Sequence, residues 1–128
     1  MSTNVPAIDA IAVTVPAERR FLGVVNLVLG GLCTRLDFPY EQVDDLQLAV
    51  DSVLAPGRPH GADVTLEAEA DEGRLRLLLG PLAPGTADQP GLQRVLGPLV
   101  GASRAVEREG AEWIAIEVAR PSAGAQAG

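Results

Sequence analysis

Side chains that could carry out catalysis are few in this chain and widely spaced. The single cysteine, Cys33, lies in an apolar run, and the single histidine, His60, lies in a segment rich in Pro and Gly. Nucleophilic catalysis needs a base within hydrogen-bond reach of the nucleophile, and no Cys–His spacing here suggests one. One cysteine also excludes an internal disulfide and a zinc site built from several cysteines. We therefore expect Cys33 in the core and His60 in a solvated loop.

The sequence does not support other common catalytic or ligand-binding functions either. None of the carboxylates lies in an apolar stretch of the kind that makes such a group a general acid. The Gly-rich segments lack the lysine of a P-loop and the glycine spacing of a dinucleotide-binding turn. A net charge of −7 argues against nucleic-acid and anionic membrane partners, which need clustered Lys and Arg. The sequence predicts no catalytic residue, no metal site, no nucleic-acid partner and no membrane partner.

The elements that must position any site form one domain. With 128 residues the chain can build a single core, assigned to residues 1–120, and the low-complexity segment 121–128 is expected to be a disordered tail. Alternation predicts strands at 8–15, 63–70, 74–79, 103–108 and 112–120, and helical spacing predicts helices at 17–35, 40–54 and 91–100. This order implies an α+β (α/β) two-layer sandwich, a mostly antiparallel sheet covered on one face by helices.

Alternation also assigns the faces of the strands. The core side is expected to carry Val64, Leu66, Ala68, Ala70, Ile114, Ile116 and Val118, with Trp113 on the opposite face. Across the hairpin at 71–73, Glu67 and Glu69 are expected to face Arg74 and Arg76.

The start of the chain lacks the basic and apolar segments of a signal peptide. Its most apolar run, 21–33, is interrupted by Asn26 and is shorter than the roughly 20 residues that a bilayer span needs. A cytoplasmic location is the expectation.

The first two predicted helices carry a family signature. Residues 24–36 (VVNLVLGGLCTRL) and 38–50 (FPYEQVDDLQLAV) resemble the N-terminal half of bacterial anti-sigma-factor serine kinases, members of the histidine-kinase-like ATPase superfamily. The predicted element order is similar to that fold as well. The resemblance implies a sigma factor or an anti-anti-sigma protein as partner. It also implies a partner contact near Asn26, where the family has an Arg; the alternative is a solvent-facing Asn on an otherwise buried helix.

The resemblance breaks at the family's ATP-contact positions. In the family a Glu polarises the attacking hydroxyl, an Asn four residues on holds Mg²⁺, and a His follows after four more. These positions hold Ser52, Pro56 and His60 here. Pro56 has no side-chain ligand for a metal and does not fit inside a helix. Asp51 lies one residue early, about 100° round the helix, so it does not simply replace the Glu.

Two further nucleotide elements differ from the family pattern. The family's adenine-reading Asp, followed by glycines, corresponds to residues 80–85 (GPLAPG), which begin at Gly80 and contain no carboxylate. The Gly-Leu-Gly-Leu motif that approaches the phosphates is reduced to Gly91 and Leu92, followed by Gln93 and Arg94. We interpret Ser52, Pro56, His60, Gly80 and Gly91 as vestigial nucleotide-site positions.

The favoured hypothesis is a regulatory protein-binding domain resembling an anti-sigma factor, without cofactor and without kinase activity. A second copy of the chain is a further candidate partner. The alternative is a divergent serine-protein kinase that uses ATP and Mg²⁺ on an anti-anti-sigma protein, with Asp51, Ser52 or His60 taking over the lost roles. A purely structural module is the third hypothesis.

Overall fold

The computed structural model describes residues 9–121, so the segment predicted as a disordered tail lies, apart from Pro121, outside the described residues. Within this range the elements are β1 (Asp9–Pro16), α1 (Arg19–Arg35), α2 (Tyr40–Val53), β2 (Asp63–Ala70), β3 (Arg74–Leu82), α3 (Pro90–Leu96), β4 (Ala102–Arg108) and β5 (Ala111–Ala119). Their order is the predicted one.

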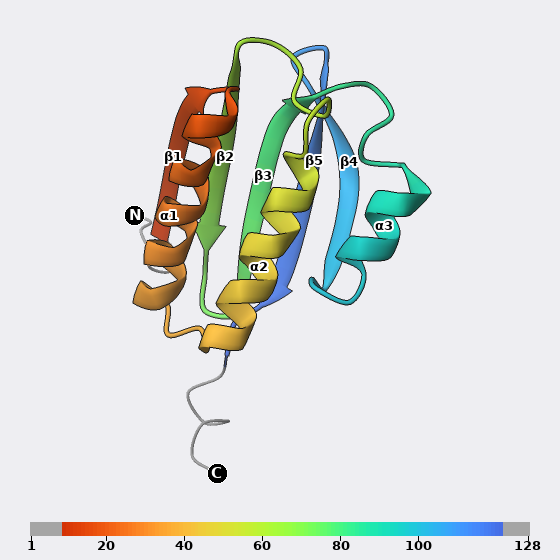
Figure 1. Cartoon of the computed structure of the whole chain (residues 1–128). Coiled ribbons are helices and arrows are strands. Elements are labelled where there is room, and N and C mark those ends of the chain that lie inside the picture. The colour runs from red at the N-terminus through yellow and green to blue at the C-terminus, as the bar shows by residue number, and fades with distance from the viewer. Residues whose placement is uncertain (1–8, 122–128) are drawn as a thin grey trace, which may run out of the picture.

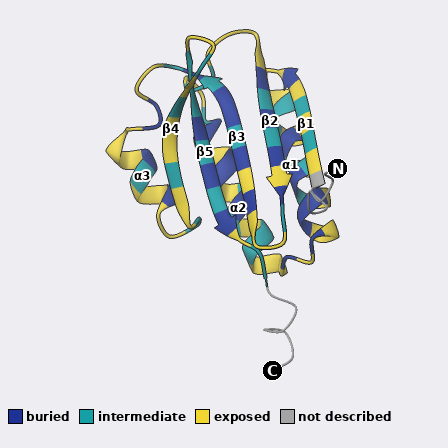
Figure 2. Ribbon diagram, turned by 180° about the vertical axis from the view of Figure 1, so that it is seen from behind, coloured by how far each residue is buried: buried dark blue, intermediate teal, exposed yellow. Residues whose placement is uncertain are grey.

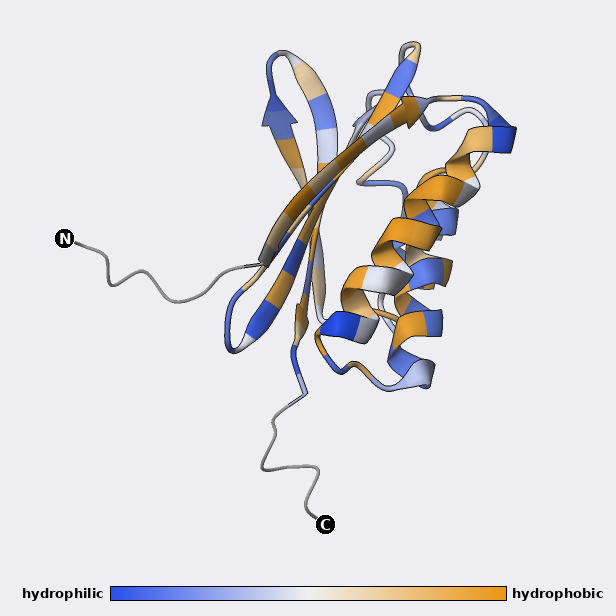
Figure 3. Ribbon diagram, turned by 90° about the vertical axis from the view of Figure 1, so that its left-hand side faces the viewer, coloured by the Kyte–Doolittle hydropathy of each residue, from blue (hydrophilic) through white to orange (hydrophobic). Residues whose placement is uncertain are grey.

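The strands form one sheet in the order β1-β2-β3-β5-β4, and each neighbouring pair is antiparallel. The three helices lie on the same face of this sheet (Figures 1 and 3). Seen from behind, the other face carries none of the helices of residues 9–121 (Figure 2). The two-layer sandwich expected from the element order is confirmed.

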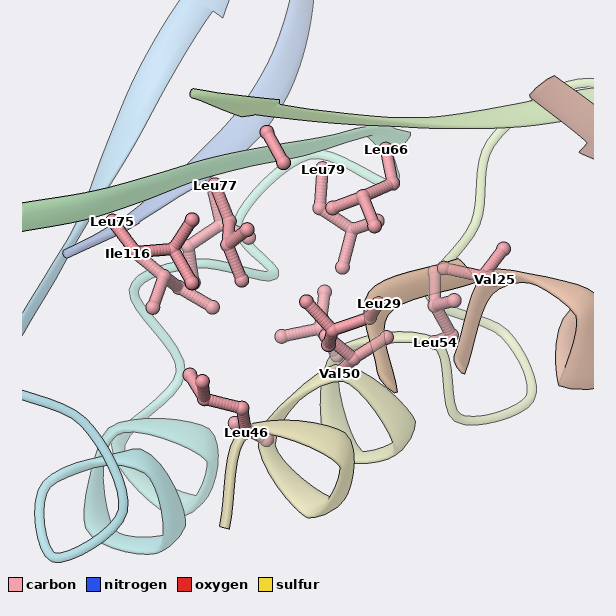
Figure 4. Packing of buried hydrophobic residues seen from close by; sticks show 14 of the residues in the cluster. Val25, Leu29, Leu46, Val50, Leu54, Leu66, Leu75, Leu77, Leu79 and Ile116 are labelled. Carbon is pink, nitrogen blue, oxygen red and sulfur yellow. The ribbon is translucent and has the colours of Figure 1, made fainter. Parts of the chain in front are cut away.

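The core fills the space between the helices and the sheet. Leucines and valines of α1 and α2, including Leu29, Leu46 and Val50, point toward the strands, where Leu66 and Leu77 meet them (Figure 4). The residues assigned to the core side of β2 and β5 are all buried, and Trp113 lies on the opposite face as expected. Aliphatic side chains thus hold the two layers together, as the scarcity of aromatic residues requires.

Most element ends agree with the prediction to within one or two residues, and the ends of β3 and α3 differ by more. β3 continues past residue 79 to Leu82, because Leu82 pairs with Glu112 after a register shift and forms an isolated bridge with Pro59. α3 ends at Leu96, not at 100. The Gly97–Pro98 step interrupts it, since proline lacks the N–H that would continue the helix.

Across the β2–β3 hairpin Glu69 lies opposite Arg76 as expected, whereas Glu67 lies opposite Leu78. The ion pairs of the two arginines are formed with Asp71 and Glu117. Arg76 contacts Asp71 at 3.1 Å and Glu117 at 3.3 Å. Arg74 contacts Glu117 at 2.9 Å, while Glu67 contacts Arg108 at 2.9 Å. The cause is the position of β5 beside β3, which places Glu117 opposite Arg76 in register. Such exposed ion pairs contribute little to the free energy of unfolding. The choice of partners follows from the order of the strands in the sheet.

Asp71 closes the β2–β3 turn and gives the fold a pH dependence. Its Oδ1 accepts hydrogen bonds from the backbone N–H groups of Gly73 (2.8 Å) and Arg74 (2.9 Å), and these bonds, with Arg76 a smaller contributor, lower the pKa of Asp71. A carboxyl group whose pKa is lowered by folding stabilises the native state above its unfolded pKa of about 3.9 and loses that effect as the pH falls through the folded pKa.

The Asp71→Asn variant is therefore expected to melt at a lower temperature than the parent chain at neutral pH. The difference should shrink as the pH falls below about 3.9 and be lost as the pH falls through the lowered pKa that Asp71 has in the folded protein. Thermal unfolding followed by circular dichroism across this pH range measures it. A difference that stays constant with pH would contradict the assignment.

Candidate functional site

The segments that carry the vestigial positions meet at one residue, Arg58. Its Nη1 donates to the backbone oxygen of Ser52 at 2.5 Å, and its Nη2 donates to Oε1 of Gln89 at 3.3 Å. Its own backbone oxygen accepts a hydrogen bond from the N–H of Ala83 at 2.6 Å. The end of α2, the segment after β3 and the residue preceding α3 are thus joined through this half-buried arginine, an arrangement we call the Arg58 junction.

The loop from 54 to 61 follows the sheet instead of continuing α2. The helix ends at Val53, so Pro56 lies beyond it and is exposed. Gly57 and Gly61 adopt φ values of 88° and 108°, which glycine tolerates and other residues rarely adopt. The N–H of His60 donates to the oxygen of Pro81 at 3.0 Å. The helical turn on which the family pattern places its metal ligand is therefore replaced by a loop paired with β3.

Ser52 and His60 point to different surroundings. The Oγ of Ser52 donates to the oxygen of Leu48, one turn earlier in α2, at 2.9 Å. The exposed His60 lines a groove of about 370 Å³ together with Leu82, Glu107 and Glu112 near the β4–β5 hairpin. No hydrogen bond joins Ser52 to His60 within residues 9–121. Their assignment as former nucleotide positions stays a prediction.

Glu112, which sequence reasoning did not single out, fixes the loop from 83 to 89. Its two carboxylate oxygens accept hydrogen bonds from the N–H groups of Gly85 (2.8 Å) and Ala87 (2.7 Å). Thr86 between them is buried, and its Oγ1 donates to the oxygen of Ala83 at 2.6 Å. Because these amides are bound to an internal carboxylate, they are not available to an anionic ligand.

Replacing Glu112 by alanine is expected to lower the free energy of unfolding by about 1–3 kcal/mol, because two amides lose a charged acceptor. Urea unfolding measures this loss, and faster hydrogen exchange at Gly85 and Ala87 would localise it. Glu107→Ala, an exposed carboxylate of the same groove, is the matched control and should change stability by less than about 0.5 kcal/mol. Equal effects of the two substitutions would contradict this role of Glu112.

Gly80 and Gly91 have unlike environments. Gly80 is buried on the uncovered face of the sheet beneath the ring of Trp113, and a Cβ at Gly80 would lie 2.6 Å from the ring atom Cδ2. Arg108 stacks on the same ring at 4.9 Å from its centroid. Gly91 lies exposed in the first turn of α3 with open space around it. The close approach at Gly80 therefore serves packing within the sheet.

Asn26 lies between α1 and α2, half-buried, which corrects the expectation of a solvent-facing side chain. Its Nδ2 donates to Oδ1 of Asp51 at 2.6 Å and lies 3.4 Å from the oxygen of Gln47. The Nε2 of Gln47 donates in return to the oxygen of Asn26 at 2.9 Å. These bonds tie the two helices together and turn Asp51 toward α1. A partner contact at Asn26 stays a prediction.

In the part of the chain that the structure describes, the side chains form no metal site and the cysteine is not a reactive thiol. Over residues 9–121, no three side chains of the His, Cys, Asp and Glu types come together in a way that could hold a metal ion. Burial raises the pKa of the Cys33 thiol to about 11, so this group is protonated and unreactive near neutral pH. The helices in the described range include none with the length and apolar character that crossing a membrane requires.

Comparison with known proteins finds a similarity to one kind of serine-protein kinase. No protein-family model matches the chain. The serine-protein kinase RsbW of Halalkalibacterium halodurans is 28% identical over 97 residues, covering 73% of this chain and 59% of the relative. RsbW of Bacillus velezensis is 29% identical over 85 residues (62% and 51%), and that of Oceanobacillus iheyensis 32% over 65 residues (51% and 41%).

The chain thus spans between two fifths and three fifths of the length of these relatives. Together with the sandwich fold, the matches confirm that this chain resembles the anti-sigma-factor serine kinases of the RsbW type.

Proposed function

We propose that this chain is a regulatory domain of the anti-sigma type, which binds a protein partner without using a nucleotide. By its resemblance, the partner is a sigma factor or an anti-anti-sigma protein, met in the cytoplasm. Support comes from the similarity to the RsbW kinases and from a fold whose two first helices carry the family signature. The whole-length activity of those kinases is not carried over.

The Arg58 junction is the observation that carries the proposed lack of nucleotide chemistry. A kinase of this fold must hold an Mg²⁺–nucleotide between the end of α2, the segment after β3 and the start of α3. Here the Arg58 guanidinium joins the first and the last of these segments through Ser52 and Gln89, and the backbone oxygen of Arg58 binds Ala83 in the second. Mg²⁺ prefers oxygen ligands, yet Pro56 offers no side-chain oxygen and the Ser52 hydroxyl is bonded within its helix. No substitute for the metal ligand is provided by these residues.

A second candidate function, a divergent serine-protein kinase, is favoured by one observation, the name that the relatives share. Phosphate transfer from labelled ATP to an anti-anti-sigma protein would support it. Asp51 is the carboxylate nearest in sequence to the family's base position, and its bond to Asn26 directs it toward α1. Loss of transfer in Asp51→Asn with binding retained would identify it as the base.

A second copy of the chain is included in the proposal as a further partner. The face of the sheet that the helices leave uncovered is seen in Figure 2. Leu78, Val106 and Trp113 are half-buried, and a second copy could cover them there. Light scattering across a range of protein concentrations tests this part of the proposal. A mass that stays that of one chain would remove the self-association and leave the regulatory partner unaffected.

Binding to candidate partners tests the main proposal. The chain is immobilised and exposed in turn to the sigma factors and anti-anti-sigma proteins of its source organism, with and without Mg²⁺-ATP. We expect a saturable complex with one of them, of equal affinity in the two conditions. No complex with any of these proteins would overturn the proposal, and a complex that forms only with Mg²⁺-ATP would favour the kinase.

A further inference from the structure

The helical layer contains a groove that the core does not explain. α1 and α2 run antiparallel beside one another (Figure 1). Near the turn between them they enclose a groove of about 690 Å³. Leu27 is 75% exposed and Tyr40 is 88% exposed on its walls. We call this the α1–α2 groove; its lining comprises Leu27, Gly30, Gly31, Thr34, Asp37, Phe38, Pro39, Tyr40, Val43 and Gln47.

Glycines and a polar bridge keep the groove open. Gly31 has no atom within 4 Å of the place where a Cβ would lie, so a side chain there would project into free space. A Cβ at Gly30 would lie 2.9 Å from Nε2 of Gln47. The bonds that join Asn26 to Gln47 and Asp51 hold the two helices at a fixed separation. The groove is therefore set by the packing of the helices, and a backbone can approach it closely at the glycines.

The rim of the groove is acidic. Asp37 lines it, and Asp44 lies one helical turn from Tyr40 on the same side of α2. Both carboxylates are exposed. On the outer side of α1, Arg20 already contacts Glu18 at 3.2 Å, and Arg35 also has an interaction partner within the protein. Apolar walls with a negative rim match a ligand that has apolar side chains flanked by positive charge.

We infer that the α1–α2 groove binds a basic amphipathic helix of a partner protein, with apolar side chains against Leu27 and Tyr40 and Lys or Arg side chains beside Asp37 and Asp44. This inference rests on the proposed function and specifies the chemistry of its partner. Apolar residues spaced by three and four along a helix fit such a groove. A second copy of this chain fits it poorly, because its exposed helix α2 is itself acidic, with Glu41, Asp44, Asp45 and Asp51.

Two labelled synthetic helical peptides of equal length test the charge requirement. Both carry leucines at the same helical spacing, one with lysines and the other with glutamates at the remaining positions. Fluorescence anisotropy should show that the chain binds the Leu/Lys peptide at least about tenfold more tightly than the Leu/Glu peptide. Equal binding of both, or binding of neither at micromolar concentrations, would overturn the inference.

Substitutions in the chain locate the binding. Gly31→Leu adds a side chain at the groove lining, at a position where a Cβ meets no atom within 4 Å. It should weaken the Leu/Lys complex at least about tenfold, with an unchanged circular dichroism spectrum. The pair Asp37→Asn and Asp44→Asn should weaken it about threefold to tenfold. The control pair Glu72→Gln and Glu107→Gln removes the same charge at exposed sites elsewhere and should change it less than about twofold. Equal effects of the two charge pairs, or no effect of Gly31→Leu, would refute the groove as the site.

The native complex separates this inference from the proposed function. If a sigma factor or anti-anti-sigma protein binds the chain and Gly31→Leu leaves that complex unchanged, the groove inference fails and the proposed function stands. If no such protein binds but the peptide shows the variant effects above, the groove stands and the proposed function fails.

Discussion

Replacing Leu29 by alanine is expected to lower the free energy of unfolding by about 3–5 kcal/mol. Leu29 is fully buried between α1 and the sheet, so the substitution loses apolar burial and leaves a cavity (Figure 4). The same substitution at Leu27, two residues earlier in the helix, removes a side chain that is 75% exposed and should cost less than about 0.5 kcal/mol. Urea unfolding of the two variants measures both losses.

Substitutions at these two leucines distinguish an effect on stability from an effect on binding within one helix. Leu27→Ala should leave stability intact and weaken the complex with a basic helix, while Leu29→Ala should act through stability alone. A Leu27→Ala variant as unstable as Leu29→Ala would show that the assigned faces of α1 are wrong.

Gly80→Ala is expected to destabilise the protein by about 1–3 kcal/mol, because the added methyl group overlaps the ring of Trp113. The overlap reaches Cγ at 2.7 Å, the ring atom attached to Cβ, so a rotation of the ring alone does not relieve it. A double-mutant cycle provides the measurement: in a Trp113→Ala background the same substitution should have almost no cost. A cost that persists without the tryptophan would contradict the packing explanation and return Gly80 to consideration as a ligand-approach position.

The helices and strands could largely be predicted from the sequence because the residues within and next to each element specify it. The strand Asp63–Ala70 alternates cleanly and ends at a turn closed by Asp71, and its bounds agree with the prediction. Pro39 directly precedes α2, which begins at Tyr40 as expected. Where a second contact decides the end of an element, the prediction failed: β3 reaches Leu82 because of its contacts with Glu112 and Pro59.

The arrangement of the site could be predicted only in part. The break of α2 before Pro56 follows from the chemistry of proline, and the offset of Asp51 follows from helical geometry. Arg58 and Glu112 carry no recognisable pattern, because their partners are mostly backbone groups 6 to 27 residues away in sequence. The bond from Asn26 to Asp51 could not be predicted, since sequence does not tell which side of α1 contacts α2.

Titration calorimetry of the purified chain with Mg²⁺-ATP and with Mg²⁺-ADP tests the central claim most directly. The Arg58 junction and the loss of the metal and adenine ligands predict no saturable heat at sub-millimolar nucleotide concentrations. Clear saturable binding of either nucleotide would contradict the interpretation of Pro56 and Gly80 as vestigial and would place the serine-kinase alternative first.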